Sequence, residues 1–83
     1  MGESLLSRVL RGGSDANIRF SDLRGALLRL GFVERVRGSH HIFTRDGVEE
    51  ILNLQPRGSL AKPYQVKQVR KVLIPYKLGA GAE

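Results

Sequence analysis

The chain has 83 residues, of which 41% are hydrophobic and 27% charged, and its formal net charge is +6. This length allows one small domain, and the apolar content is that of a folded protein, which argues against global disorder. With no cysteine, disulfides and thiolate chemistry are excluded, and no apolar run approaches the roughly 18 residues that span a bilayer.

The first predicted element is a short helix over residues 2–11, with Leu5, Leu6 and Val9 near one side. Gly12-Gly13 ends it, because glycine pairs favour loops. The N-terminus has only a short apolar patch and does not have the pattern of a secretory signal. A cytoplasmic protein is the expectation.

The second element is an amphipathic helix that starts near Ser21. Serine is a favourable N-cap, and Asp22 suits the positive end of a helix dipole. Gly31 stands where a glycine ends a helix. Between these signals the apolar residues recur with helical spacing, at Leu23, Ala26, Leu27 and Leu30.

Three strands are predicted next, over residues 32–37, 40–45 and 48–54. Asp46-Gly47 between the last two is a strong signal for a two-residue hairpin turn. A tight turn there pairs Arg45 with Val48, Phe43 with Glu50, and His40 with Asn53.

Alternation along these strands separates two faces. The face with Phe43 is the more apolar one and should pack on the helices, together with His41, Leu52 and Leu54. His40 is left on the open face, together with Ile42, Thr44, Ile51 and Asn53.

A loop over residues 55–61 leads to the last helix, which Pro63 opens at a position where its missing N–H costs nothing. Pro75 should end this helix near Ile74. One face carries apolar residues, Val66, Val69, Val72, Leu73 and Tyr76. The adjoining face is a basic ridge formed by Lys67, Arg70 and Lys71.

The element order predicts an α+β fold of two layers, α-β-β-β-α, in which a three-stranded antiparallel sheet carries two helices on one face. We divide the chain into an N-terminal arm with a possible short helix (1–19), a main domain (20–78) and a flexible tail (79–83). Residues 55–78 hold six basic side chains and no acidic one. Such a concentrated basic surface is typical of proteins that bind a polyanion.

Both histidines of the chain lie in the segment Gly38-Ser39-His40-His41, with Arg35, Arg37 and Arg45 close by. Imidazole exchanges a proton near neutral pH, and arginine binds phosphate well. His40 could therefore be the general base that removes the proton of a ribose 2′-hydroxyl, with Arg37, Arg45 or Lys62 holding phosphate. Gly38 would allow close backbone approach, and Ser39 offers a hydroxyl.

The alternative is that both histidines are structural. His41 should point to the helices and have a structural or orienting role. Adjacent strand residues face opposite ways, so the two imidazoles cannot both bind one metal ion, and no metal site is expected. The basic ridge suits the shape-based reading of double-stranded RNA, although a solvated helix face would look the same.

Several of these segments closely resemble HicA-type toxins, the toxin halves of HicA–HicB toxin–antitoxin pairs. The similarity covers about residues 20–78, and the Gly-Ser-His step before an aromatic residue is its most specific part. The segments are Gly38-Ser39-His40-His41-Ile42-Phe43, Ile51-Leu52-Asn53-Leu54-Gln55 and Ala61-Lys62-Pro63-Tyr64-Gln65-Val66-Lys67-Gln68-Val69-Arg70.

The resemblance implies a fold like the double-stranded RNA-binding domain and ribosome-independent mRNA cleavage in which His40 is essential. It also implies a HicB-like antitoxin as partner. Our hypothesis is a cytoplasmic, metal-independent endoribonuclease toxin that inhibits translation, with no membrane partner and no cofactor. The residues expected to hold RNA are Arg37, Gly38, Ser39, Lys62, Lys67, Arg70 and Lys71.

Two other functions remain open. The chain could be a non-catalytic module that binds double-stranded nucleic acid through the basic ridge, with salt-dependent affinity and no cleavage. It could also be a protein-interaction module in which the Ile42–Ile51 pair on the open face is the partner patch.

Overall fold

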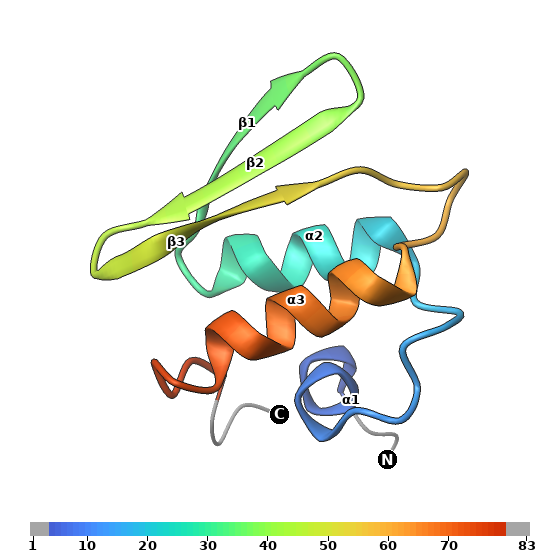
Figure 1. Cartoon of the computed structure of the whole chain (residues 1–83), viewed down its shortest axis with the longest axis horizontal. Coiled ribbons are helices and arrows are strands. Elements are labelled where there is room, and N and C mark those ends of the chain that lie inside the picture. The colour runs from blue at the N-terminus through green and yellow to red at the C-terminus, as the bar shows by residue number, and fades with distance from the viewer. Residues whose placement is uncertain (1–3, 80–83) are drawn as a thin grey trace.

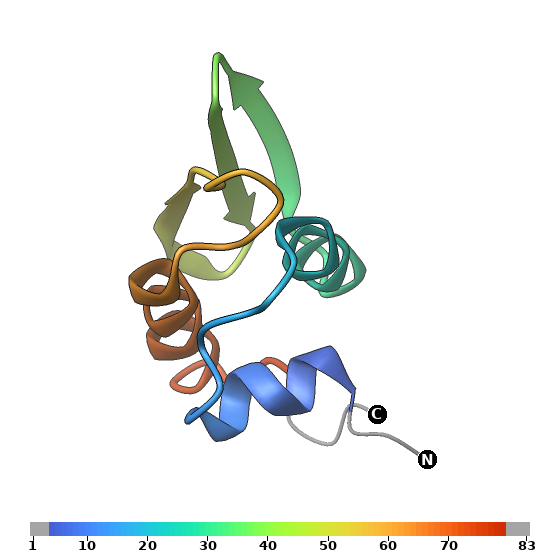
Figure 2. The ribbon, with the colours of Figure 1, turned by 90° about the vertical axis from the view of Figure 1, so that its right-hand side faces the viewer.

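The computed structural model describes residues 4–79. Within this range the chain forms an α+β fold with three helices and a three-stranded sheet. Figures 1 and 2 show the sheet on one side of α2 and α3, and α1 on the other side. The elements are α1 (Leu5–Arg11), α2 (Phe20–Arg29), β1 (Val33–Arg37), β2 (His40–Arg45), β3 (Val48–Leu54) and α3 (Pro63–Leu73).

The sheet is antiparallel with the order β1-β2-β3, so β2 is the central strand. The expected pairing of Arg45 with Val48 is confirmed, but Phe43 lies opposite Leu52 and not Glu50. A bulge between Phe43 and Arg45 takes up two extra residues of β3. Because the shift is even, every side chain stays on its predicted face.

The same bulge overturns the expected pairing of His40 with Asn53. Asn53 lies opposite Ile42, and His40 lies opposite Arg37 of β1. His40 and Asn53 nevertheless share a face, since the parity of the register is unchanged.

The boundaries of α2 differ from expectation only at its start. The helix begins at Phe20, and Arg19 is the N-cap without a side-chain hydrogen bond, so Ser21 is not the cap. The start of α2 is instead fixed by a hydrogen bond from the loop before α3, because the Phe20 N–H donates to the Ser59 carbonyl. Gly31, with φ of 95°, ends the helix as predicted.

The last helix begins at Pro63 and ends at Leu73, with Ile74 as the C-cap, as predicted. Its apolar face packs into the core, and the helix-facing side of the sheet covers the same core, which confirms the assignment of the two sheet faces. The fully buried side chains are Phe43, Ile18, Leu23, Leu27, Leu54, Leu73, Val9, Val66 and Val69.

The segment that we treated as an arm contributes to this core. Val9 of α1 and Ile18 are both 0% exposed, and α1 packs on the side of α2 and α3 that the sheet leaves open (Figure 2). The fold therefore has a third, helical layer in addition to the two predicted. Residues 2–3 of the predicted first helix and residues 80–83 of the predicted tail lie outside the described residues.

Between residues 4 and 79, no helix is both long and apolar enough to cross a membrane.

Candidate functional site

The Gly38–Ser39 turn joins β1 to β2 and puts His40 at the first position of β2. Gly38 has φ of 60°, and a glycine at the first central position of a two-residue turn suits the twist of the flanking strands. His40 lies opposite Arg37. The turn therefore brings one imidazole and one guanidinium group to the end of the sheet that projects away from the helices (Figure 1).

The His40 imidazole is exposed, and Asn53 of β3 holds one side of it. Nδ1 of His40 lies 3.1 Å from Oδ1 of Asn53. Because an amide oxygen can only accept a hydrogen bond, Nδ1 carries a proton in this contact, and in the neutral ring the lone pair is then on Nε2. No described residue bonds to Nε2, so this nitrogen can accept a proton from a molecule in solution.

A second set of hydrogen bonds connects the turn to the start of α3. Gln55 Nε2 donates to Ser39 Oγ over 2.8 Å, and Lys62 Nζ donates to Gln55 Oε1 over 3.4 Å. The Gln55 N–H in turn donates to Oε1 of the buried Gln65, over 3.0 Å. The fold thus places Ser39 and Lys62, which are distant in sequence, at the two ends of one polar chain.

Two arginines of β1 lie on the same face as His40. Arg37 is the strand partner of His40 and Arg35 is the partner of Ile42. Both side chains are exposed, and neither has an ion pair or side-chain hydrogen bond within residues 4–79. The open face therefore carries two guanidinium groups that are available to an anion.

The lysines expected on the basic ridge, Lys67 and Lys71, are exposed on α3. The hydrogen bonds from Arg70 hold the pKa of Asp15 below its ordinary value, and the charge of Lys67 adds a smaller contribution. Lys67 is three residues before Arg70 on α3 and so lies on the side of the helix whose Arg70 binds Asp15, between α1 and α2. The structure does not bring it together with His40.

Two other arginines are occupied inside the protein. Arg70 donates from Nη1 to Asp15 Oδ1 over 2.9 Å and from Nη2 to Asp15 Oδ2 over 3.0 Å, and also reaches the Val9 carbonyl. Arg45 donates from Nε to the Leu30 carbonyl at the end of α2, over 2.8 Å. The guanidinium groups of Arg70 and Arg45, which we expected to bind RNA and phosphate respectively, are thus engaged within the protein.

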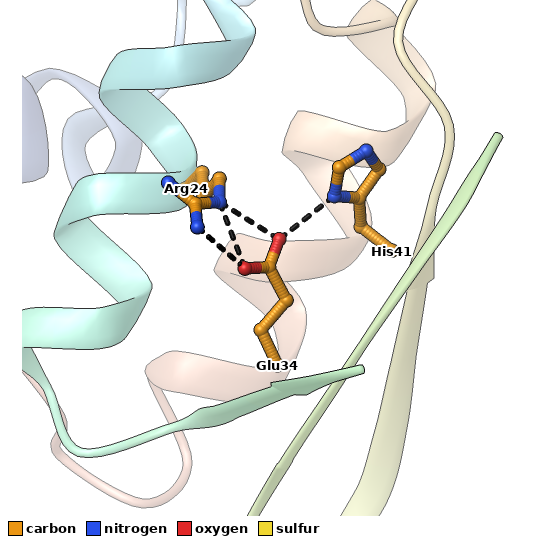
Figure 3. Close-up of polar contacts among 3 residues, drawn as sticks. All are labelled: Arg24, Glu34 and His41. Atoms are coloured by element: carbon orange, nitrogen blue, oxygen red, sulfur yellow. Dashed lines mark hydrogen bonds and ion pairs between the residues drawn. The ribbon is translucent and has the colours of Figure 1, made fainter. Parts of the chain in front are cut away.

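The second histidine belongs to a different cluster, shown in Figure 3. Nδ1 of His41 lies 2.7 Å from Glu34 Oε2. Arg24 of α2 grips the same carboxylate, with Nε 2.8 Å from both oxygens and Nη2 2.8 Å from Oε1. The His41 ring also meets the Phe20 ring edge-on at 4.7 Å between centroids. As predicted, His41 points to the helices, where it links β2 to β1 and α2.

The charges in this cluster stabilise one another. The hydrogen bond from Arg24 holds the pKa of Glu34 below its ordinary value, with a smaller contribution from His41, and Glu34 raises the pKa of Arg24 in return. An ionised Glu34 accepts a hydrogen bond from the Nδ1–H group of His41, which keeps a proton on this nitrogen.

Sequence reasoning placed Asn53 on the face of His40 without giving it a role. It missed Glu34, which binds His41, and Gln55, which connects Ser39 to Lys62. A signal for Glu34 was available, because counting back from the Gly38–Ser39 turn puts it on the same strand face as His41. No local signal points to Arg24, since its side chain meets Glu34 only when α2 packs beside β1.

Within the described part of the chain, no group of three or more His, Asp, Glu or Cys side chains is arranged to hold a metal ion. The two histidines contact different partners on opposite faces of β2, His40 with Asn53 and His41 with Glu34. Their chemistry is therefore that of two separate imidazoles.

The site consists of an exposed imidazole whose Nδ1 binds Asn53, a hairpin turn connected to Lys62, and two guanidinium groups on the same face that have no partner among residues 4–79. No known protein family, curated protein or solved structure gives a significant match to this chain.

Proposed function

We propose that this protein is an endoribonuclease in which His40 is the general base. One observation carries the proposal: Asn53 binds Nδ1 of an exposed imidazole and leaves Nε2 free, beside the unpaired guanidinium group of Arg37. A base of this kind must have its lone pair directed at the substrate and must reach it without a barrier of protein atoms.

In the proposed reaction, Nε2 of His40 removes the proton of a ribose 2′-hydroxyl. The 2′-oxygen then attacks the adjacent phosphorus, and the bond from phosphorus to the 5′-oxygen of the next nucleotide breaks. The departing 5′-oxygen takes up a proton. The products are a 2′,3′-cyclic phosphate and a 5′-hydroxyl end, so the reaction consumes no water and needs no redox partner.

The neighbouring residues have supporting roles in this proposal. Arg37 holds the phosphate and stabilises the charge that grows on its oxygens in the transition state. Gly38 and Ser39 let the backbone of the turn approach the substrate. Lys62, tied to Ser39 through Gln55, adds positive charge at the same end of the sheet.

We further propose that the protein is a HicA-like toxin that inhibits translation by cutting mRNA, with a HicB-like antitoxin as its partner. The support is the resemblance around Gly38-Ser39-His40-His41-Ile42-Phe43, together with an order of one helix, three antiparallel strands and one helix over Phe20–Leu73. The same order is the basis for proposing a fold like the double-stranded RNA-binding domain.

The chemistry is tested with purified full-length protein and a labelled RNA in buffer containing EDTA. We expect cleavage products that end in 2′,3′-cyclic phosphate. An RNA that carries a 2′-deoxy sugar at the cleaved position should resist cleavage there, because the attacking oxygen is absent. Products that end in 3′-hydroxyl groups would contradict the proposed reaction.

The role of His40 is tested by His40→Ala, with Gln68→Ala on the exposed face of α3 as matched control. Loss of a general base should slow cleavage by about 10²–10⁴-fold. Asn53→Ala should slow it less, because the imidazole remains but its tautomer is no longer held. Gln68→Ala should cleave like the wild type.

Equal cleavage by the wild type and His40→Ala would refute the role of His40. RNA binding without any cleavage by the wild type would favour the non-catalytic module instead. In bacteria, induced expression should arrest growth and stop amino-acid incorporation, and His40→Ala should abolish both effects at equal protein levels.

A further inference from the structure

The open face of the sheet holds a hollow of about 570 Å³ next to the His40 site. Arg37, one of its lining residues, lies directly opposite His40 on the neighbouring strand. Arg35 lies opposite Ile42, which is two residues from His40 on β2. Its lining residues are Arg35, Val36, Arg37, Ile42, Thr44 and Ile51.

The charge of this hollow is one-sided. Its lining contains two arginines and no acidic residue. Of the acidic side chains on the three strands, Glu34 binds Arg24 on the helix side and Glu50 accepts a hydrogen bond from the Tyr76 hydroxyl. Glu49 is exposed on β3, two residues from Ile51 and toward the Asp46-Gly47 turn. A polyanion that lies across the hollow therefore meets attraction at its β1 side, where the two arginines lie.

The floor of the hollow is apolar. Ile51 is 64% exposed, and Ile42, which lines the same hollow, is half-buried. The two are not the direct pair that we expected, because Ile42 lies opposite Asn53. Exposed apolar side chains on the strands next to the arginines of β1 suit a ligand that offers both flat apolar surfaces and negative charges. A single-stranded nucleic acid has this combination, because its unstacked bases expose their faces while its phosphates stay outside. In a duplex the base faces are covered by stacking.

The spacing of the face also suits a single strand. Side chains on one face of a strand recur every second residue, about 6.6 Å apart. This distance is of the same order as the step between neighbouring phosphates in an extended strand. Arg35 and Arg37 are two residues apart on β1, so each guanidinium group can bind a successive phosphate.

We propose that the open face of the sheet binds a single-stranded segment of the RNA, with Arg35 and Arg37 on successive phosphates and with Ile42 and Ile51 against the bases. The proposal rests on the ribonuclease function proposed above and adds to it the form of the substrate and the surface that holds it. The basic ridge on α3 is then not the surface that delivers RNA to His40.

Binding is measured with His40→Ala as background, so that the RNA stays intact. The probe is an unstructured RNA of 12 nucleotides, compared with the same RNA annealed to its complement. We expect the single strand to bind at least 10-fold more tightly than the duplex. Preference for the duplex, or no binding of either at low salt, would overturn the proposal.

The surface is located by two double variants that remove the same charge. Arg35→Ala with Arg37→Ala should weaken single-strand binding by at least 10-fold and reduce the slope of log affinity against log salt by about 1.4, or 0.7 for each lost phosphate contact. Lys67→Ala with Lys71→Ala should change affinity less than 3-fold. Equal losses in both would show that net charge alone matters and would refute the assigned surface.

The apolar floor is tested by Ile51→Ser, with Ile74→Ser as control, because Ile74 is 53% exposed at the end of α3. We expect Ile51→Ser to weaken single-strand binding about 5-fold with an unchanged salt slope, and Ile74→Ser to have no effect. If Ile51→Ser in the His40→Ala background binds the single strand as tightly as His40→Ala alone, the proposed contact between Ile51 and the bases is wrong.

The two proposals fail in different ways. If the wild type never cleaves but the binding pattern holds, the surface is correct and the nuclease function is wrong. If the wild type cleaves and the arginine double variant cleaves and binds equally well, the nuclease function holds and the surface is wrong. All substituted positions in the single-strand test are solvent-accessible, and circular dichroism verifies folding of each variant.

Discussion

The two faces of the sheet differ in whether their polar side chains are paired within the protein. On the helix side, His41, Glu34 and Arg24 bind one another. On the open side, Arg35 and Arg37 have no partner among residues 4–79, and His40 makes a single contact to Asn53.

This difference separates stability from binding. A charge that is paired inside the fold lowers the free energy of the folded state, and its removal leaves the partner unsatisfied. An unpaired charge on the surface contributes little to stability. We therefore expect substitutions on the helix side to lower the stability of the protein and substitutions on the open face to change what it binds.

The largest effect should come from Phe43→Ala. Phe43 is 0% exposed under the sheet, and loss of a buried aromatic ring costs about 3–5 kcal/mol. Ile51→Ala on the open face should cost less than about 0.5 kcal/mol. Urea unfolding measures both. If Phe43→Ala does not fold, Phe43→Leu should still be less stable than the wild type.

A smaller loss of stability is expected when the contacts between Arg70 and the N-terminal segment are removed. Arg70→Met removes the hydrogen bonds to Asp15 and to the Val9 carbonyl, which should lower the free energy of unfolding by about 2 kcal/mol. Arg57→Met removes the same charge from an exposed loop and should be nearly neutral. Equal losses in Arg70→Met and Arg57→Met would show that the contacts of Arg70 add no stability.

The hairpin turn offers a test with opposite signs. Gly38→Ala forces a side chain into φ of 60° and should cost about 1 kcal/mol, although nothing lies within 4 Å of the added carbon. Gly25→Ala in α2 should instead stabilise by about 0.5–1 kcal/mol, because alanine favours helix. Thermal unfolding distinguishes the two signs.

The smallest effect is a change in pH dependence. Because Arg24 lowers the pKa of Glu34, the folded state binds this proton less readily than the unfolded state. The ionised carboxylate therefore stabilises the fold at pH values above 4.5, the ordinary pKa of this group. This stability is lost as the pH falls through the lower pKa that Glu34 has in the folded state.

Glu34→Gln should thus be less stable than the wild type at neutral pH, and the difference should shrink toward acid. Urea unfolding between pH 7 and pH 3 measures it. Asp15→Asn should behave in the same way, since Arg70 lowers the pKa of Asp15. A difference that grows toward acid would contradict the ion pair in Figure 3.

Local patterns predicted the elements well. The alternation in β2 and the glycine after α2 depend on neighbours in sequence, and both the faces of the sheet and the end at Gly31 are confirmed. The bulge opposite Phe43 was missed, because the Asp46-Gly47 turn predicts only the first pair of the hairpin.

Contacts between residues far apart in the sequence could not be predicted from local patterns. Arg70 on α3 looked like one more cation of an exposed ridge, and only the packing of α1 shows that it meets Asp15, 55 residues earlier. The position of His40 beside Asn53 was predicted from strand parity, whereas its hydrogen bond depends on the register that the bulge sets.

The close contact between the two ends of the described chain has a practical consequence. A carbon added at Gly79 would lie 2.9 Å from Leu6, and α1 lies on the far side of the molecule from the sheet (Figure 1). A short linker could therefore join residues 4 and 79, the ends of the described range, with new ends cut at Asp46-Gly47. Such a circular permutant would keep His40 and the arginines of β1 on one continuous stretch of chain.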